Sequence, residues 1–529
     1  MKKALITLTA ALLLLTGCAN TKENTTANEE TASVKETETV NQNTYEDVTV
    51  SDVASVVSSE EYGFTTRDTD ASYNLAESTV VTMNGDSVTV EGSGAAYENG
   101  VLTITQEGTY YLTGTLNGHV EVNVMDSEKV QIVLSNATIN SSDYACIYIV
   151  EADKVFLSLD KGTTNTLSDG TAYNVGTEDS GVDGCIFSKA DLTINGSGTL
   201  VVNGNYAHGI VSKDDLIVTN GTITVDSTSS ALSGKDCVKI GGGTLTLNAG
   251  SDGIKSTNDT DEGRGYVYIS GGTITIDAQD DGINAATDVI VDGGELNITT
   301  ADGATYTSAS SNWFYGDDSS EASAKGIKAG NSITINNGEI TVNSTDDSVH
   351  SNNTVTINGG TLDLSSGDDA IHADALLTIN GGTITISAHE GLEATQIVIN
   401  DGTVDITASD DGINAAQKVS GVTPTIEING GDITVNMGQG DTDALDSNGN
   451  IFINGGTITI SAQSPFDYDG QGAINGGTVT VNGSAVTQMS NQMMGGMGGM
   501  GQTMPGGNAS GMMPGGNMGG FGGGGHGRP

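Results

Sequence analysis

The sequence predicts an all-β protein, a parallel β-helix (solenoid) with rungs of about 21–22 residues and an N-terminal β cap region. An acidic turn recurs with this period: Asp347, Asp369, Glu390 and Asp411 follow one another at spacings of 22, 21 and 21 residues. Between the turns the amino-acid sequence is nearly the same from one unit to the next, and VTINGGTLDLSS at 355–366 is an example. Its alternating apolar and polar residues indicate strands with one buried face, and Asn-Gly-Gly supplies the corner between them.

Other repeat architectures fit this unit poorly. A unit of this length with two glycines and several β-branched residues has no room for a helix pair, and the leucine and asparagine pattern of leucine-rich repeats is absent. In a parallel β-helix each unit is one rung, and the inward Ile and Val form continuous ladders. Cys146 and Cys185 hold the same rung position and are predicted to stack as small buried residues, although export would also permit a disulfide.

The composition limits the class of partner. Eighteen Lys and Arg stand against 67 Asp and Glu, which gives a formal net charge of −49. Nucleic acid is excluded as a partner because binding its phosphates requires clustered cations. Aromatic residues make up only 4% of the chain, whereas 75 residues are Gly. This composition favours β structure with many tight turns.

The N-terminal residues have the form of a secretory signal peptide. Lys2 and Lys3 precede an apolar stretch at 4–15, and the stretch ends in LTGC. This ending resembles the lipobox of bacterial lipoproteins, in which Cys18 is lipidated; a chance Cys after an ordinary signal is the alternative. No later stretch is apolar over 18 residues, so the lipid is the expected anchor. We predict an exported, membrane-anchored lipoprotein at the cell surface.

Composition divides the chain into five segments. Residues 1–17 form the lipoprotein signal peptide, and 18–45, rich in Thr, Asn and Glu, form a disordered tether. Residues 46–142 form the N-terminal β region and cap, and 143–487 form the parallel β-helix. The Met- and Gly-rich segment 488–529 is predicted to be a disordered tail, because it cannot offset the entropy of its own ordering.

Stacked rungs would place the acidic turns in one column at an edge of the β-helix. Unit charges about 4.8 Å apart repel by roughly 3.5 kcal/mol at an effective dielectric constant of 20. Calcium binds carboxylate oxygens at about 2.3–2.6 Å, so one ion can bridge two rungs. Alternatively, Asp serves only the turn geometry. We predict Ca²⁺ as the cofactor, with these ligands: Asp252, Asp280, Asp281, Asp302, Asp346, Asp347, Asp368, Asp369, Glu390, Asp410 and Asp411.

Basic residues accompany the acidic turns. They are Lys255, Lys325, Lys328, His350 and His372, the two histidines at matching positions of adjacent rungs. The simplest interpretation is that they relieve repulsion among the carboxylates. A calcium-dependent uronate lyase would instead use a strong base next to the metal, and Arg264 with Lys255 is the candidate pair. The chain contains only three Arg, which favours a non-catalytic protein.

One inserted loop holds the only Trp of the chain. Trp313, Phe314 and Tyr315 follow one another in an otherwise polar segment. Aromatic faces stack on the apolar faces of sugar rings, so these residues are predicted to contact carbohydrate. The alternative is that the loop folds its rings back onto the β-helix.

The order of the motifs along the chain is similar to that of a known protein family. Residues 101–170 contain GTYYLTGTLNG and then GTTNTLSDG, and rungs with NGGTITI and DDGI follow. Over roughly 79–487 this series resembles a family of exported bacterial carbohydrate-binding proteins. The resemblance implies a polysaccharide-lyase-like, right-handed β-helix, binding to cellulose-like and pectic polymers, and calcium held on the β-helix. Glu390 and Lys325 depart from a uniform Asp column, which argues against continuous occupancy by calcium.

Three functions remain open. The first is a lipid-anchored surface protein, stabilised by calcium, that binds pectic or cellulose-like polysaccharide of plant or envelope origin without catalysis. The second is a calcium-dependent polysaccharide (uronate) lyase, and the third is a structural surface adhesin. A charge of −49 repels polygalacturonate, so a pectic ligand requires calcium as a bridge, whereas a neutral glucan does not.

Overall fold

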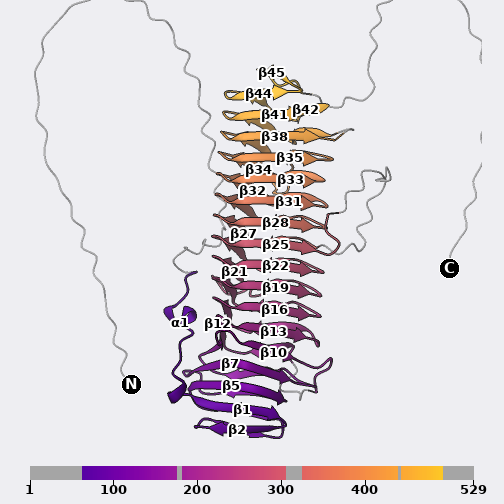
Figure 1. Cartoon of the computed structure of the whole chain (residues 1–529). Coiled ribbons are helices and arrows are strands. Elements are labelled where there is room, and N and C mark those ends of the chain that lie inside the picture. The colour runs from indigo at the N-terminus through magenta and orange to yellow at the C-terminus, as the bar shows by residue number, and fades with distance from the viewer. Residues whose placement is uncertain (1–61, 175–180, 305–323, 439–441, 492–529) are drawn as a thin grey trace, which may run out of the picture. The chain divides into compact units, whose positions relative to one another are not determined.

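The structure is a computed structural model that describes residues 62–174, 181–304, 324–438 and 442–491, all within one unit of the chain. These residues form a parallel β-helix (Figure 1), which confirms the predicted fold class. Each rung passes through three faces, here called A, B and C, and apart from strands at the two ends each strand pairs in parallel with its equivalents one rung before and after. Within the described part, no helix has both the length and the apolar character needed to cross a membrane.

Face A carries the strands that follow the Asn-Gly-Gly corner. In stacking order they are β1 (Thr79–Gly85), β5 (Gly108–Asn117), β7 (Lys129–Asn140), β10 (Thr164–Ser168), β13 (Thr199–Gly204), β16 (Thr222–Ser227), β19 (Thr244–Ala249), β22 (Thr273–Ala278), β25 (Glu295–Thr300), β28 (Glu339–Ser344), β31 (Thr361–Ser366), β33 (Thr383–Ala388), β35 (Thr403–Ala408), β38 (Asp432–Met437), β41 (Thr457–Ser461) and β44 (Thr478–Val481). Antiparallel partners close the two ends of this face: β2 (Ser87–Glu91) pairs with β1, and β45 (Ser484–Val486) pairs with β44.

Face B follows the acidic turn, here called the A–B turn. Its strands are β3 (Ala95–Glu98), β4 (Val101–Ile104), β6 (His119–Asn123), β8 (Ile147–Glu151), β11 (Gly184–Ser188), β14 (His208–Ser212), β17 (Leu232–Gly234), β20 (Ile254–Ser256), β23 (Ile283–Ala285), β26 (Ile327–Ala329), β29 (Val349–Ser351), β32 (Asp369–Ile379), β34 (Glu390–Ile399), β36 (Ile413–Ala415), β39 (Asp443–Ser447) and β42 (Ser464–Tyr468). The first pair, β3 with β4, is antiparallel.

Face C completes the rung. Its strands are β9 (Lys154–Leu159), β12 (Asp191–Gly196), β15 (Asp215–Val218), β18 (Cys237–Ile240), β21 (Tyr266–Ile269), β24 (Asp288–Val291), β27 (Ser332–Ile335), β30 (Thr354–Ile357), β37 (Thr425–Ile428), β40 (Asn450–Ile453) and β43 (Gly472–Ile474). The long strands β7, β32 and β34 each contribute to face C as well as to their own face.

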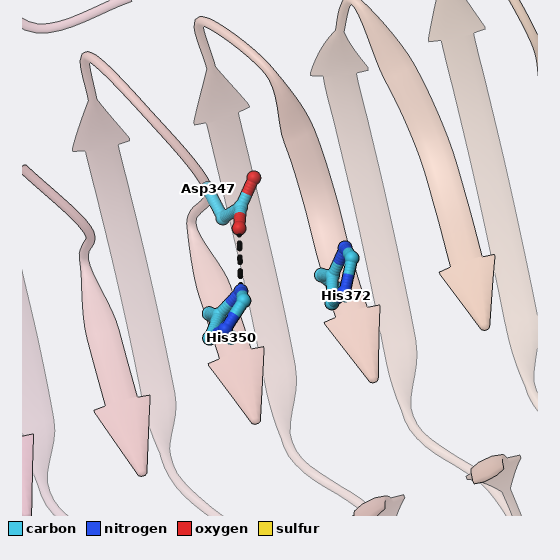
Figure 2. A group of neighbouring side chains, drawn as sticks. All are labelled: Asp347, His350 and His372. Carbon is cyan, nitrogen blue, oxygen red and sulfur yellow. Dashed lines mark hydrogen bonds and ion pairs between the residues drawn. The ribbon is translucent and has the colours of Figure 1, made fainter. Parts of the chain in front are cut away.

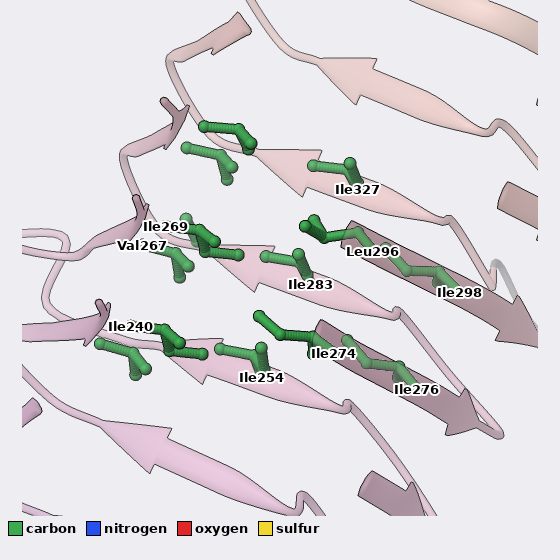
Figure 3. Packing of buried hydrophobic residues seen from close by; sticks show 14 of the residues in the cluster. Ile240, Ile254, Val267, Ile269, Ile274, Ile276, Ile283, Leu296, Ile298 and Ile327 are labelled. Atoms are coloured by element: carbon green, nitrogen blue, oxygen red, sulfur yellow. The ribbon is translucent and has the colours of Figure 1, made fainter. Parts of the chain in front are cut away.

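The interior is a set of aliphatic ladders (Figure 3). On face B the register places Ile283 between Ile254 and Ile327, and all three side chains are fully buried. This packing follows directly from the alternation in the sequence, because one side of each strand points inward. Cys146 and Cys185 are buried free thiols on adjacent rungs, and the Cys146 amide donates to the Cys185 carbonyl over 2.8 Å, which confirms their predicted stacking.

The corner between faces C and A is fixed by glycine and by an asparagine ladder. Gly382 has a φ of +97°, and a Cβ there would lie 3.0 Å from the Gly360 carbonyl oxygen. Each Asn Nδ2 after the first donates to the Oδ1 of the Asn one rung earlier, at 2.7 to 3.0 Å, and the first, Asn336, donates to Asp292. The ladder consists of Asn336, Asn358, Asn380, Asn400, Asn429, Asn454 and Asn475.

The Asn380→Ala variant is expected to lower the free energy of unfolding by about 1 kcal/mol, because two exposed hydrogen bonds of modest net value are lost. Urea denaturation monitored by circular dichroism measures this change. The matched control is Gln279→Ala, an exposed residue of an A–B turn, which should alter stability little. Equal stability of Asn380→Ala and the parent protein would show that the ladder contributes nothing.

A strap of chain crosses face C at the N-terminal side of the β-helix. It contains α1 (Thr66–Thr69) and the 3-10 helix η1 (Leu75–Glu77). Asp68 is 1% exposed, and its carboxylate lies 2.9 Å from Lys154 Nζ and accepts a hydrogen bond from Thr193 Oγ1. Burial opposes ionisation, but bonds from Lys154, Thr65 and Thr193 outweigh it and lower the pKa of Asp68 to about 2. Tyr62 stacks on Tyr268 at 5.3 Å and fixes the start of the strap.

Candidate functional site

The A–B turns place two columns of polar side chains along one edge of the β-helix. The first, here called the turn column, consists of Asp252, Asp281, Lys325, Asp347, Asp369, Glu390, Asp411 and Asp443. The residue three positions later lies on face B and forms the strand column, which consists of Lys255, Asn284, Lys328, His350, His372, Glu393, Asn414 and Asp446. The two columns run side by side because parallel strands keep their register from rung to rung.

One oxygen of several turn-column carboxylates has a structural role. Asp281 Oδ1 accepts a hydrogen bond from the Lys325 amide at 2.9 Å, and Asp347 Oδ1 accepts one from the Asp369 amide at 3.1 Å. Asp411 Oδ1 accepts one from the Asp443 amide at 3.2 Å. Each bond joins one rung to the next at a turn where the ladder of strand hydrogen bonds is interrupted. The second oxygen remains for other contacts.

In the earlier rungs this second oxygen is neutralised by the protein's own amines. Lys255 Nζ lies 2.7 Å from Asp252 Oδ2, and Lys328 Nζ lies 3.1 Å from Asp281 Oδ2. Lys325 replaces an acid in the turn column, and its Nζ lies 2.8 Å from Asp346 and 2.9 Å from Asp347. These ion pairs offset part of the repulsion that the sequence predicts among the carboxylates.

Two histidines continue this neutralisation (Figure 2). His350 Nδ1 lies 2.7 Å from Asp347 Oδ2, and the rings of His350 and His372 stack at 4.7 Å, which confirms their predicted matching positions. His372 Nδ1 lies 2.8 Å from Asp369 and 2.9 Å from Glu393. Burial opposes the charge, but these two carboxylates raise the pKa of His372 to about 10, so the ring is cationic at neutral pH.

The later rungs differ because two of their carboxylates, Asp411 and Asp446, lack such an amine or imidazole partner among the described residues, whereas His389 lies beside Glu390 and Asp410. We call Glu390, Asp410, Asp411 and Asp446 the C-terminal acid cluster. Burial, followed by the charges of Asp446, Asp410 and Glu390, raises the pKa of Asp411 to about 8. Burial and neighbouring aspartates also raise the pKa of Asp446 to about 6. Among the described residues, no basic side chain forms an ion pair with Asp411 or Asp446.

The donor set of this cluster suits a hard cation. Asn414 is 9% exposed; its Nδ2 donates to Glu390 at 3.0 Å, whereas its buried Oδ1 has no hydrogen-bond partner in the described structure. Asn414 faces Asp446 in the register of β36 and β39. Carboxylate oxygens next to an amide oxygen are typical calcium ligands, and a cation would both satisfy the Asn414 oxygen and lower the raised pKa of Asp411. Glu390, Asp411, Asn414 and Asp446 are therefore residues that could hold calcium.

The predicted ligands are only partly brought together. Asp280, Asp346, Asp368 and Asp410 directly precede the turn column and lie at its rim. Asp302 is exposed and stands outside the column, because Lys325 supplies the carbonyl that bonds Gly282. The aromatic residues Trp313, Phe314 and Tyr315 and the lipidation site Cys18 lie outside the described residues.

Sequence reasoning missed Asp443, which breaks the 21–22-residue period of the turn column, and three members of the strand column. Asp443 follows Asp411 by 32 residues, because insertions precede β37 and β39. Glu393, Asn414 and Asp446 carry a signal that the sequence does contain: each stands three residues after its turn-column residue. The same offset separates Asp347 from His350 and Asp252 from Lys255.

The two candidate lyase bases are both engaged with carboxylates. Arg264 lies 3.2 Å from Asp215 and 3.6 Å from Asp236, whereas Lys255 pairs with Asp252 in the turn column. Burial acts against the charge, but Asp215 and Asp236 raise the pKa of Arg264. A more firmly protonated guanidinium is suited to pairing rather than to abstracting a proton.

Comparison with known proteins identifies the family of the chain. The family model for carbohydrate-binding domain-containing proteins matches residues 98–370 and 368–500. A carbohydrate-binding domain-containing protein of Acetivibrio thermocellus is 35% identical over 145 residues, which are 27% of this chain and 49% of that protein, so the chain spans about half the length of this curated relative. A solved structure, the gadolinium derivative of the polysaccharide lyase-like protein from C. thermocellum, is 34% identical with a TM-score of 0.40, covering 42% of this chain and 94% of that one.

Proposed function

Because the chain belongs to the family of carbohydrate-binding domain-containing proteins, we propose that it is a lipid-anchored surface protein that binds pectic or cellulose-like polysaccharide without catalysis. The observation that carries this proposal is the extent of the family match, which takes in nearly all rungs of the β-helix. The LTGC ending at Cys18 supports export and a lipid anchor, which would hold the bound polysaccharide close to the cell.

We propose calcium as a stabilising ion of the C-terminal acid cluster, rather than of the whole edge as the sequence predicts. The internal ion pairs from Asp252 to Asp369 already offset part of the carboxylate charge there. The raised pKa of Asp411 and the unsatisfied oxygen of Asn414 support a cation in the later rungs. When bound, calcium would supply positive charge between two rungs and thereby stiffen this end of the rod.

The test is binding of the full chain to insoluble cellulose and to polygalacturonate, each in calcium and in chelator, with melting followed in parallel. We expect one of the two polymers to retain the protein and calcium to raise the melting temperature. Retention on polygalacturonate only in calcium would identify a metal-bridged pectic ligand. If neither polymer retains the protein while calcium still raises melting, the carbohydrate function is refuted and a structural role replaces it. An unsaturated product absorbing in the ultraviolet would instead establish a lyase.

A further inference from the structure

The same edge of the β-helix carries a groove in its first rungs. Its lining comes mostly from the turns that follow β5, β7 and β10, which lie at the indigo end of the β-helix in Figure 1. The groove has a volume of about 530 Å³, which is within the usual range for ligand sites. Its floor consists of the A–B turns of successive rungs, where the register stacks Asn117, Asn140 and Ser168 above one another. Such a row repeats hydrogen-bonding groups at the spacing of the strands, about 4.8 Å.

Several polar groups of the groove are available to a ligand. The side chains of Asn140, Ser142 and Asp143 are exposed and form no hydrogen bond with any other described residue. An amide, a hydroxyl and a carboxylate together offer both donors and acceptors. Sugar hydroxyl groups are donors and acceptors at once, so they complement this mixed set.

A series of rings begins in the groove lining and continues along the next rungs. His119, Tyr144, Tyr173 and Tyr206 come from four successive rungs, with neighbouring ring centroids 5.0, 5.7 and 4.2 Å apart. The first ring belongs to the groove lining itself. Tyr206 is 41% exposed, which is unusual for so large an apolar group in this molecule. Aromatic faces of this kind bury the apolar faces of sugar rings.

The charge of the groove excludes a polyanion. No Lys or Arg belongs to its lining, whereas Asp143 and Asp169 do. Burial lowers the pKa of His119, so its ring is neutral at pH 7 and adds no positive charge. A uronate chain would therefore meet carboxylates and no cation.

We propose that this groove is the glycan-binding site and that its ligand is a neutral β-linked glucan chain lying along the edge, across several rungs. The inference rests on the proposed carbohydrate-binding function and deepens it by choosing between the two polymer classes. An extended β-linked chain keeps a straight course and presents flat apolar faces to the ring series, while its hydroxyl groups reach the row of turns. The advance of such a chain per sugar residue is similar to the rung spacing.

Affinity electrophoresis of the full chain in gels containing soluble mixed-linkage β-glucan, with calorimetry against cellohexaose, tests the site. Tyr206→Ala is expected to weaken binding about tenfold through loss of ring stacking, and Asn140→Ala is expected to weaken it further. Asn140 is exposed and its side chain forms no hydrogen bond with any other described residue, so Asn140→Ala should leave the melting temperature unchanged, whereas Tyr206→Ala also loses its stacking on Tyr173 and should lower the melting temperature slightly. Leu75→Ala is the matched control, an exposed apolar residue on the strap outside the groove lining, and should bind normally.

The outcomes separate this site from the broader function. If the parent protein binds β-glucan and both groove variants bind equally well, the groove is overturned while carbohydrate binding stands. If the parent protein binds polygalacturonate but no β-glucan, the ligand class is overturned. If it binds neither polymer, the site and the proposed function fail together.

Discussion

Replacing Asp68 by Ala is expected to lower the free energy of unfolding by about 3–5 kcal/mol, the usual effect of removing one partner from a buried ion pair. Lys154 is almost as buried as Asp68, so its ammonium group would remain inside the interface between the strap and face C with only the more distant Asp191, at 3.8 Å, as a counter-ion. Thr193 Oγ1 would lose its acceptor as well. Urea unfolding followed by circular dichroism measures the loss.

A second variant separates the effect of losing the Asp68–Lys154 ion pair from the effect of losing side-chain packing. Asp68→Ala combined with Lys154→Met removes both charges, and we expect it to recover much of the stability, because an apolar replacement of a buried pair is often close to neutral. If the single variant is as stable as the parent protein, the strap does not depend on this ion pair. Since Asp68 has a pKa of about 2 in the folded state, its contribution should persist down to about pH 4 and disappear below it.

The second large effect concerns the C-terminal acid cluster. Calcium at a hundredfold excess over its dissociation constant is expected to stabilise the parent protein by about 2.7 kcal/mol. Asp411→Asn should abolish most of this gain in stability, because it removes a charged ligand from the proposed calcium site. In chelator at pH 8 the same variant should be at least as stable as the parent protein, since it relieves repulsion from Asp446, Asp410 and Glu390.

Thermal unfolding of both proteins in calcium and in chelator measures these changes. Asp281→Asn is the matched control: Asp281 pairs with Lys328, so this variant should lose stability in both conditions and keep the response to calcium. An unchanged calcium response in Asp411→Asn would place the ion elsewhere or refute its binding.

The raised pKa of Asp411 also predicts a pH dependence with a definite sign. Asp411 keeps its proton up to about pH 8 in the folded state, whereas the unfolded chain loses it near its ordinary pKa of 3.8. The unfolded state thus binds fewer protons between these values, and stability in chelator should fall as the pH rises from about 4 to 8. Calcium binding should release this proton, so the apparent affinity for calcium should increase over the same range.

The sequence predicts the fold well because the amino-acid sequence of one rung recurs with few changes. The period of 21–22 residues, the alternation and the Asn-Gly-Gly corner together define each strand and the faces that carry it. The strap escapes prediction because its contacts are made once, between residues 62–78 and face C, so no repeat reveals them. Propensity alone cannot indicate that Asp68 would be buried against Lys154.

The sequence predicts the column of acidic turns, but it does not predict which of these carboxylates are neutralised by a basic side chain. Repetition of the turn reveals the column, but whether a carboxylate is neutralised depends on the residue three positions later, which is Lys255, His350 or Asn414 in different rungs. The sequence predicts Asp302 in the turn column, whereas the structure places Lys325 there. The long insertion between the two residues makes the period ambiguous, and only the backbone hydrogen bonds identify which of them belongs to the rung.

The asparagine ladder also affects how readily the β-helix is damaged by deamidation. Most of its members are followed by Gly, as in Asn358-Gly359 and Asn380-Gly381, and an Asn followed by Gly is the dipeptide whose side chain cyclises most readily onto the next amide. Each ladder bond holds the Asn amide against the preceding rung and so withholds it from this reaction. Deamidation would place a carboxylate oxygen where a donor stood, opposite the acceptor oxygen of the rung before it. The bonds that stabilise the corner thus also protect it, and damage at one rung would expose its neighbour.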